Sequence, residues 1–349
     1  MEILDKEANW TAEQLNARQD EWMETLTPAQ LADLDNALQS AKRAGHDCAS
    51  LTREAFPLDD MLPVIERIRD RLENGLGLHV LRGVPTWNYQ KPDLRLMYWG
   101  LGLHLGTPVS QSRNGDLLGD VKNFNIDIKS HRGRGYTSKQ RLDFHTDSCD
   151  VVALFVLNTA MQGGLSMLAS SLAIHDEIKR TRPDLLELLY QPFYWSWREQ
   201  EPPGDLPYYP QPVYTVEQGR FSSRFVPGHI RNGQRYPDVP RLTDAQVEAI
   251  NLIETIANDP RFHFAMMFQP GDFQFLNNHL IYHARTDFED YPEPERCRHL
   301  LRMWLSVPNS RPLSPLMSTI FRDRTPGAVR GGFPSRVGTH FYETRVTTD

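Results

Sequence analysis

Apolar side chains recur every three or four residues through much of the first hundred positions, the spacing that gives a helix one buried face. The segment after Thr27-Pro28 is the clearest example, because a helix-starting proline precedes the repeat and Gly45 follows it. Another helix is expected after Thr11, which forms a capping-box pattern with Gln14. Besides the helix after Thr11, the predicted helices of this part cover residues 27–45, 60–73 and 92–105.

From Gly106 onward the pattern changes to short apolar runs separated by glycine, proline, asparagine and aspartate. Such runs are typical of strands in a β-sandwich or barrel rather than of alternating strands and helices. The predicted strands cover residues 77–84, 151–157, 213–216, 262–268, 272–276 and 300–307. Helices are expected at residues 170–181 and 243–257, and loops at 201–212 and 237–240.

Composition and charge limit the kinds of partner that this protein is expected to bind. The 349 residues carry a net charge of −7, which argues against a nucleic-acid partner because no domain-wide basic surface is expected. Three cysteines without a CxxC pair indicate a reducing compartment, and the first residues lack the features of a signal peptide. The apolar run 151–157 is too short to cross a membrane. We therefore expect a cytoplasmic protein that binds neither nucleic acid nor membranes.

The triplet His145-Thr146-Asp147 is the strongest chemical signal in the chain. Residues i and i+2 of an extended segment project to the same side, so His145 and Asp147 could bind one ion. A further histidine would complete the two-His-one-carboxylate set of non-heme iron(II) oxygenases. A similar triplet, His175-Asp176-Glu177, lies in a predicted helix, where i and i+2 point apart, and is discounted.

Two later histidines are candidates for the third ligand. A predicted strand ends in the Asn277-Asn278 turn, and the chain then returns through His279 to His283. We favour His283, but the spacing alone does not exclude His279.

Two arginines on a predicted apolar strand suggest an anion site. Arg298 and Arg302 are four residues apart and are expected to face the same side as Leu300. A buried guanidinium is costly unless it meets an anion, and a dicarboxylate would supply one. The alternative is a buried ion pair with an aspartate or glutamate.

These stretches together resemble the taurine dioxygenase-like branch of the iron(II)/2-oxoglutarate-dependent oxygenases, over about residues 78–307. The matching motifs are His145-Thr146-Asp147, Gly163-Gly164-Leu165-Ser166, Gly271-Asp272 leading to Asn277-Asn278 and His283, and the pair Arg298 and Arg302. The resemblance implies a mainly β fold with flanking helices and a double-stranded β-helix core (jelly roll, cupin-like). We expect one domain, with a helical flank at 1–76, the oxygenase core at 77–310 and a C-terminal extension at 311–349.

The resemblance also implies the role of each site residue. Iron(II) is held by His145, Asp147 and His283. Arg298 grips the distal carboxylate of 2-oxoglutarate, assisted by Ser166, where the family more often has threonine. Arg302 faces the primary substrate or supports the cosubstrate, and the two arginine roles could be exchanged.

The implied reaction consumes 2-oxoglutarate and O2, releases succinate and CO2, and oxidises a C–H bond of a small substrate. A retained carboxylate at Asp147 favours hydroxylation, with desaturation or ring closure also open, and a pocket-facing Arg302 favours an anionic substrate. Pocket candidates are Asn125, Tyr136, Arg224 and Phe225. Alternatives are an inactive jelly-roll protein that binds a small acid and a cupin-like metalloenzyme that does not use 2-oxoglutarate. The sequence gives no indication of oligomeric state.

Overall fold

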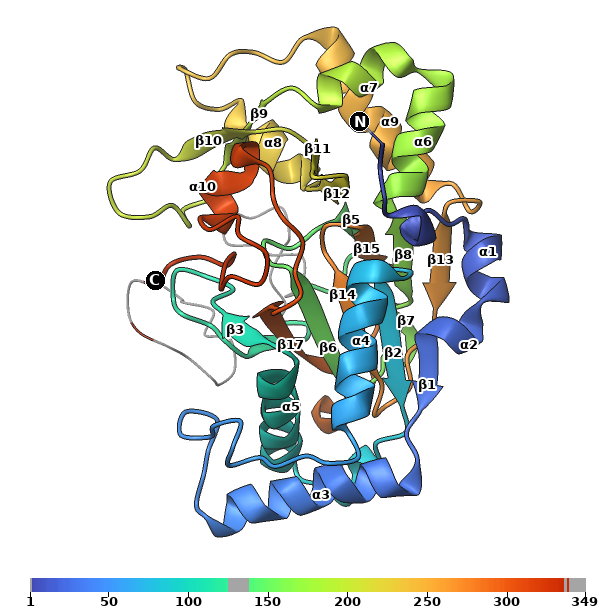
Figure 1. The fold of residues 1–349 in the computed structure, drawn as a ribbon, viewed down its shortest axis with the longest axis vertical. Coiled ribbons are helices and arrows are strands. Elements are labelled where there is room, and N and C mark those ends of the chain that lie inside the picture. The colour runs from blue at the N-terminus through green and yellow to red at the C-terminus, as the bar shows by residue number, and fades with distance from the viewer. Residues whose placement is uncertain (1, 125–137, 336–337, 339–349) are drawn as a thin grey trace.

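Two β-sheets and the helices around them form the fold of the computed structural model, which describes residues 2–124, 138–335 and 338 (Figure 1). The larger sheet has the strand order β1-β2-β14-β6-β17-β3, with β4 also paired to β17. Its strands are β1 (Met23–Thr25), β2 (Leu78–Arg82), β3 (Thr107–Val109), β4 (Gly119–Val121), β6 (Val151–Asn158), β14 (Phe273–Asn277) and β17 (His299–Ser306). The smaller sheet has the order β13-β8-β15-β5. Its strands are β5 (Leu142–His145), β8 (Ser166–Ser170), β13 (His263–Met266) and β15 (Ile281–Arg285).

Three short strand pairs complete the β-structure of the described residues. They join β9 (Phe193–Ser196) to β10 (Tyr208–Gln211), β11 (Tyr214–Glu217) to β12 (Arg220–Ser223), and β7 (Gln162–Gly163) to β16 (Phe288–Glu289). The α-helices are α1 (Ala12–Ala17), α2 (Gln19–Trp22), α3 (Pro28–Arg43), α4 (Leu62–Asn74), α5 (Lys91–Leu105), α6 (Ser171–Thr181), α7 (Pro183–Leu189), α8 (Pro227–Gly233), α9 (Asp244–Asn258) and α10 (Ser318–Phe321).

Alternate side chains of β6 separate the two parts of the core. Val152 and Val156 belong to the cluster that also contains Phe144 and Met167 of the smaller sheet. Val151 and its alternate neighbours belong to a second cluster, shared with apolar residues of α3, α4 and α5. Strands with a period of two therefore bury one face between the sheets and the other under the helices. This arrangement confirms the predicted double-stranded β-helix core with flanking helices.

Helices cover the outer faces in two groups (Figure 1). Helix α4 packs on β2 and β14, while α5 packs on β3 and β17 and is covered by α3. Helices α6, α7 and α9 pack together at the opposite end, beside β5 and β8. None of the described helices is both long enough and apolar enough to cross a membrane.

The predicted helix starts are confirmed by side-chain contacts. The side chain of Thr11 accepts from the Gln14 amide, and the Gln14 side chain accepts from the Thr11 amide. Thr27 forms the same reciprocal pair with Gln30 at the start of α3. Each pair satisfies two backbone N–H groups that the first helical turn leaves without partners.

The predicted loop at 201–212 is wrong at its end, where residues 208–211 form β10. Tyr209 is buried, and β10 pairs with β9 through a register that sets Pro210 opposite Tyr194. Proline is tolerated here because β10 is an edge strand of a two-stranded ribbon. The proline signal therefore indicated a sheet edge rather than an irregular loop.

Both ends of the described chain contact the core. Strand β1 of the N-terminal flank pairs in parallel with β2, so this flank is not purely helical. In the extension, the buried guanidinium of Arg330 forms an ion pair with Asp150, with Nε and Oδ1 2.9 Å apart. Asp150 also accepts a hydrogen bond from His279. The boundaries at residues 76 and 310 stay a prediction.

Candidate metal centre

Strand pairing brings the two predicted histidine ligands together. His145 is the last residue of β5, and the antiparallel register of β15 sets His283 directly opposite it. The two imidazole rings lie 4.2 Å apart between centroids. Because opposite residues of neighbouring strands point to the same face, both rings face one point at the end of the sheet.

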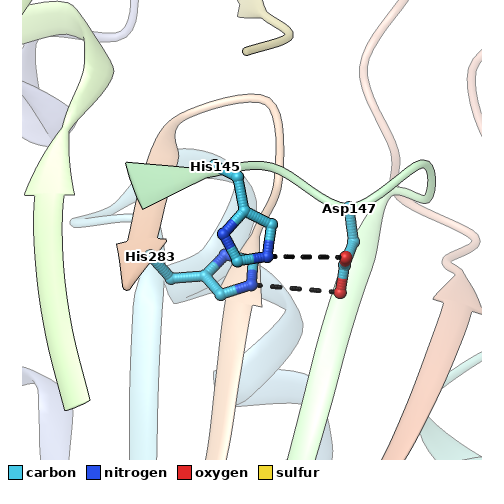
Figure 2. Close-up of side chains that lie close together, drawn as sticks. All are labelled: His145, Asp147 and His283. Atoms are coloured by element: carbon cyan, nitrogen blue, oxygen red, sulfur yellow. Dashed lines mark ion pairs between the residues drawn. The ribbon is translucent and has the colours of Figure 1, made fainter. Parts of the chain in front are cut away.

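Asp147 lies in the loop between β5 and β6 and points at both rings (Figure 2). Its Oδ1 is 3.9 Å from Nε2 of His145, and its Oδ2 is 3.9 Å from Nε2 of His283. One ligand atom from each of the three residues lies within 4.8 Å of the others. Donor atoms that each lie about 2.1 Å from one ion are about 3 to 4 Å apart, so the three side chains fit a mononuclear site.

The protonation of the two imidazoles suits metal binding. Nδ1 of His145 lies 2.9 Å from the Asp143 carbonyl oxygen, which can only accept, so Nδ1 donates this hydrogen bond and Nε2 is the nitrogen that faces Asp147. Burial and the neighbouring His145 lower the pKa of His283 to about 3, so its ring is neutral near pH 7. No described group accepts a hydrogen bond from Nδ1 of His283.

The carboxylate of Asp147 is ionised and fixed from several sides. Burial alone would raise its pKa, but the charge of Arg302 and the hydrogen bond from Trp304 favour the ionised form, and the pKa is lowered. The indole N–H of Trp304 donates to Oδ2 at 2.8 Å, and Nη1 of Arg302 lies 3.4 Å from the same oxygen. The backbone amide of Asp147 donates to Oδ1 of Asn278 at 3.0 Å. Two imidazoles and one carboxylate held by hydrogen bonds form a donor set suited to iron(II), with positions left open for other ligands.

Trp304 provides a test of how far carboxylate orientation controls metal affinity. Replacing Trp304 with phenylalanine keeps the buried ring but removes the N–H that holds Oδ2. Partners of ligating groups typically contribute 10–100-fold to affinity, so we expect Fe(II) affinity to fall by about that factor in an anaerobic titration.

Trp22→Phe is the matched control for this variant. The indole of Trp22 is also buried and donates to a carbonyl, that of Leu15, but lies outside the site. Both variants should lose similar stability, and Trp22→Phe should keep its Fe(II) affinity. Equal Fe(II) affinity in the two variants would show that Trp304 does not position the carboxylate.

A second group of buried cations lies beside the Gly163-Gly164 turn. Both glycines have positive φ, and a Cβ at Gly164 would lie 3.3 Å from Nε of Arg298. The guanidinium of Arg285, on β15, lies over the same Phe288 ring as that of Arg298, at 4.7 and 5.2 Å from its centroid. Ser166 follows the turn and faces Arg285 across the β8–β15 register.

The two arginines of this group repel each other and are buried. Burial and the neighbouring Arg285 lower the pKa of Arg298 to about 9, and burial lowers that of Arg285 to about 10. Nη1 of Arg298 is buried without a described partner, whereas Arg285 donates to the carbonyl oxygens of Ser138, Gln140 and Thr286. An anion at this place would satisfy Arg298 and offset the repulsion.

The structure separates residues that the sequence left as alternatives. His279 does not face the candidate centre, because its Nε2 donates to Oδ1 of Asp150 at 2.9 Å. Arg302 contacts Asp147 and donates from Nε to Oε1 of Gln111 at 2.7 Å, so its surroundings differ from those of Arg298. The discounted His175 lies in α6 and contacts Asp176 and Tyr190 instead.

The predicted pocket residues fall into two groups. The backbone of Phe225 exchanges hydrogen bonds with Thr146, and Arg224 is buried beside the same segment. Asn125 and Tyr136 lie outside the described residues.

Sequence reasoning missed the roles of Trp304, Gln111 and Arg285. The position of Trp304 in the site could have been predicted from the sequence, since it lies two residues after Arg302 on β17 and therefore on the same face. The role of Gln111 could not have been predicted from the sequence, because its contact with Arg302 depends on how distant segments fold together.

Comparison with known proteins places this geometry in context. Residues 41–304 match the family described as "Taurine catabolism dioxygenase TauD, TfdA family". The chain is 30% identical over 308 residues to the FR-33289 synthase of Streptomyces rubellomurinus, a match that covers 86% of this chain and 89% of that protein.

Solved structures share the fold. Asparagine oxygenase in complex with Fe(II), 2S,3S-3-hydroxyasparagine and succinate aligns with a TM-score of 0.63 at 16% identity, covering 81% of this chain and 93% of that one. The non-heme iron oxygenase OrfP in complex with Fe and alpha-ketoglutaric acid aligns with a TM-score of 0.61 at 15% identity, with the same two coverages. At these identities the likeness establishes the fold.

Proposed function

The chain belongs to the taurine catabolism dioxygenase TauD, TfdA family, and on that premise we propose which of its residues perform the family's reaction. The protein is a non-heme iron(II)- and 2-oxoglutarate-dependent dioxygenase that hydroxylates a small substrate. We propose that His145, Asp147 and His283 hold the iron and that Arg298, with Ser166, anchors 2-oxoglutarate.

The convergence of three distant side chains supports the iron site. Two imidazoles and a carboxylate face one point, with one ligand atom of each within 4.8 Å of the others. With iron(II) bound, the centre supplies the redox chemistry by which one oxygen atom of O2 enters a C–H bond and the other enters succinate as CO2 leaves 2-oxoglutarate. The protein's own part is to orient the ligands and to exclude water.

The unsatisfied cation beside Gly164 supports Arg298 as the 2-oxoglutarate anchor. A distal carboxylate there would accept from the guanidinium of Arg298 and lie near the hydroxyl of Ser166, which is buried and 3.3 Å from Oε1 of Gln274. Arg302 is the weaker candidate, because it already contacts Asp147 and Gln111. We assign Arg302 to holding the iron-binding carboxylate.

Family membership disfavours the alternatives of an inactive acid-binding protein or a cupin-like enzyme that does not use 2-oxoglutarate. The intact ligand set points the same way, because two histidines and a buried aspartate would be costly to hold together without an ion. Desaturation and ring closure consume 2-oxoglutarate and O2 in the same way as hydroxylation. Only the identity of the product formed from the primary substrate distinguishes the three reactions.

An anaerobic spectrum tests the proposal directly. Adding Fe(II) and 2-oxoglutarate without O2 should produce the weak visible charge-transfer band of the chelate, because one ion then binds the keto oxygen and a C1 carboxylate oxygen of the cosubstrate. Admitting O2 should yield succinate. The control is His263→Ala, since His263 lies in the same sheet but caps the Ala257 carbonyl instead of facing the centre. A wild-type protein that binds Fe(II) but gives neither band nor succinate would contradict the proposed function.

A further inference from the structure

Arg224 is a buried cation beside the candidate centre that the roles assigned above leave unused. It is only 2% exposed, and burial lowers its pKa. Its backbone amide donates to the Val213 carbonyl at 2.8 Å, which fixes the position of the residue. Burying a guanidinium without an anion is energetically costly, so the partners of this side chain indicate what it binds.

Most of the hydrogen-bonding capacity of Arg224 is unmet among the described residues. Nη2 donates to the hydroxyl of Ser148 at 3.1 Å, but Nε and Nη1 are buried without a partner. These two nitrogens carry three of the five N–H groups of a guanidinium. No described carboxylate forms an ion pair with the side chain, whereas the buried Arg311 pairs with Asp5 and Glu73, and the buried Arg330 pairs with Asp150.

Contacts with aromatic rings do not supply the missing acceptors. The guanidinium carbon lies 4.7 Å from the centroid of Trp195 and 5.7 Å from that of Tyr209. Such contacts stabilise the cation through its flat faces, while the N–H groups point outward in its plane. The hydroxyl oxygen of Tyr209 interacts with the same guanidinium, which leaves its O–H available as one more donor beside the cation.

The chain holds Arg224 next to the residues proposed to bind iron. Thr146, between the ligands His145 and Asp147, donates its amide to the Phe225 carbonyl at 2.8 Å, and its hydroxyl accepts from the Phe225 amide at 3.1 Å. Ser148, the partner of Arg224, directly follows Asp147. Arg224 is thus held beside the segment proposed to bind iron, through contacts on both sides of Asp147.

Arg224 and Arg298 lie in different surroundings. Arg298 contacts Gly164 and Phe288, whereas Arg224 contacts Trp195, Tyr209 and Ser148. A single small diacid that occupies the Arg298 site therefore leaves Arg224 for another ligand.

We propose that Arg224 binds an oxoanion group of the primary substrate, and so selects a small anionic substrate and orients its C–H bond toward the iron. This inference rests on the proposed function, because it assigns the substrate side of the same site. The ligand group is a carboxylate, phosphate, phosphonate or sulfonate, each of which can accept from the free N–H groups and from the Tyr209 hydroxyl.

Calorimetric titration of the protein loaded with Fe(II) and saturating 2-oxoglutarate, without O2, tests the assignment. Methylphosphonate and acetate are the probes, and saturating cosubstrate keeps them from the Arg298 site. We expect saturable binding to the wild-type protein and a loss of about 10- to 100-fold in Arg224→Gln, the loss typical of a charge-assisted hydrogen bond. Arg224→Lys should bind with intermediate affinity, since it keeps the charge but not the planar fork. The tighter of the two probes distinguishes a tetrahedral from a planar group.

Arg235→Gln is the matched control, because Arg235 also stacks on a tyrosine, Tyr236, but is exposed. It should bind both probes like the wild-type protein. The chelate band, measured in every sample, must be unchanged in the Arg224 variants, which separates loss of the oxoanion site from misfolding.

The outcomes are distinguishable. Wild-type protein that shows the chelate band but binds neither probe, or binds them as tightly in Arg224→Gln and Arg224→Lys, overturns the assignment of Arg224 alone. Absence of the chelate band in the wild-type protein overturns the proposed function and this inference with it.

Discussion

Replacing His283 with alanine is expected to reduce Fe(II) affinity by more than about 100-fold and to abolish 2-oxoglutarate turnover, since even partners of metal ligands contribute 10–100-fold. The variant removes one of two imidazoles that face Asp147, and the described neighbours offer no replacement donor. Stability should change little, because Nδ1 of His283 has no described partner to lose. Equilibrium dialysis for iron and assay of succinate measure the two effects.

His279→Ala is the informative comparison, because His279 was the competing ligand in the sequence. This residue is buried and donates to Asp150, so its loss should lower the free energy of unfolding by about 1–3 kcal/mol. Its Fe(II) affinity should stay at the wild-type value. If His279→Ala loses iron and His283→Ala retains it, the proposed metal site is wrong.

Replacing Arg298 with glutamine should raise the KM for 2-oxoglutarate by about 10- to 100-fold, which corresponds to about 1.5–3 kcal/mol for a hydrogen bond to a charged group. Fe(II) affinity without cosubstrate should be unchanged, because Arg298 does not contact the three proposed ligands. The change also removes one of two buried cations that repel each other, so stability should not fall. Steady-state kinetics at varied 2-oxoglutarate measures the effect.

The variant Arg302→Gln distinguishes the proposed role of Arg302 from that of Arg298. It removes the cation beside Asp147, so the expected result is weaker Fe(II) binding with little direct change in 2-oxoglutarate affinity once iron is saturating. The opposite pattern, with a raised KM in Arg302→Gln and a normal KM in Arg298→Gln, would mean that the two roles are exchanged.

Local signals in the sequence were sufficient to predict the helices and one pair of proposed metal ligands. Capping pairs such as Thr11 with Gln14 act within one turn, so they are readable from neighbouring residues. His145 and Asp147 are two positions apart, and an extended backbone brings them to one side.

Strands without a strong local pattern were harder to predict. Strand β8, with the sequence Ser-Met-Leu-Ala-Ser, lacks β-branched residues and is buried at every position. It is a strand because β13 and β15 pair with it on both sides. The pairing of β10 with β9 likewise overrode the prolines of its segment.

The sequence by itself determined the donor types, the proposed His-x-Asp ligand pair and the class of β-fold, because each depends on side-chain chemistry or on neighbours a few residues away. Only the tertiary structure shows that His283 and not His279 lies beside this pair, and that Arg298 and Arg302 have different surroundings. The positions of these side chains depend on the β5–β15 register and on the irregular pairing at the start of β17. Sheet register is set by packing between segments far apart in the chain, and a shift of one residue would turn every side chain to the other face.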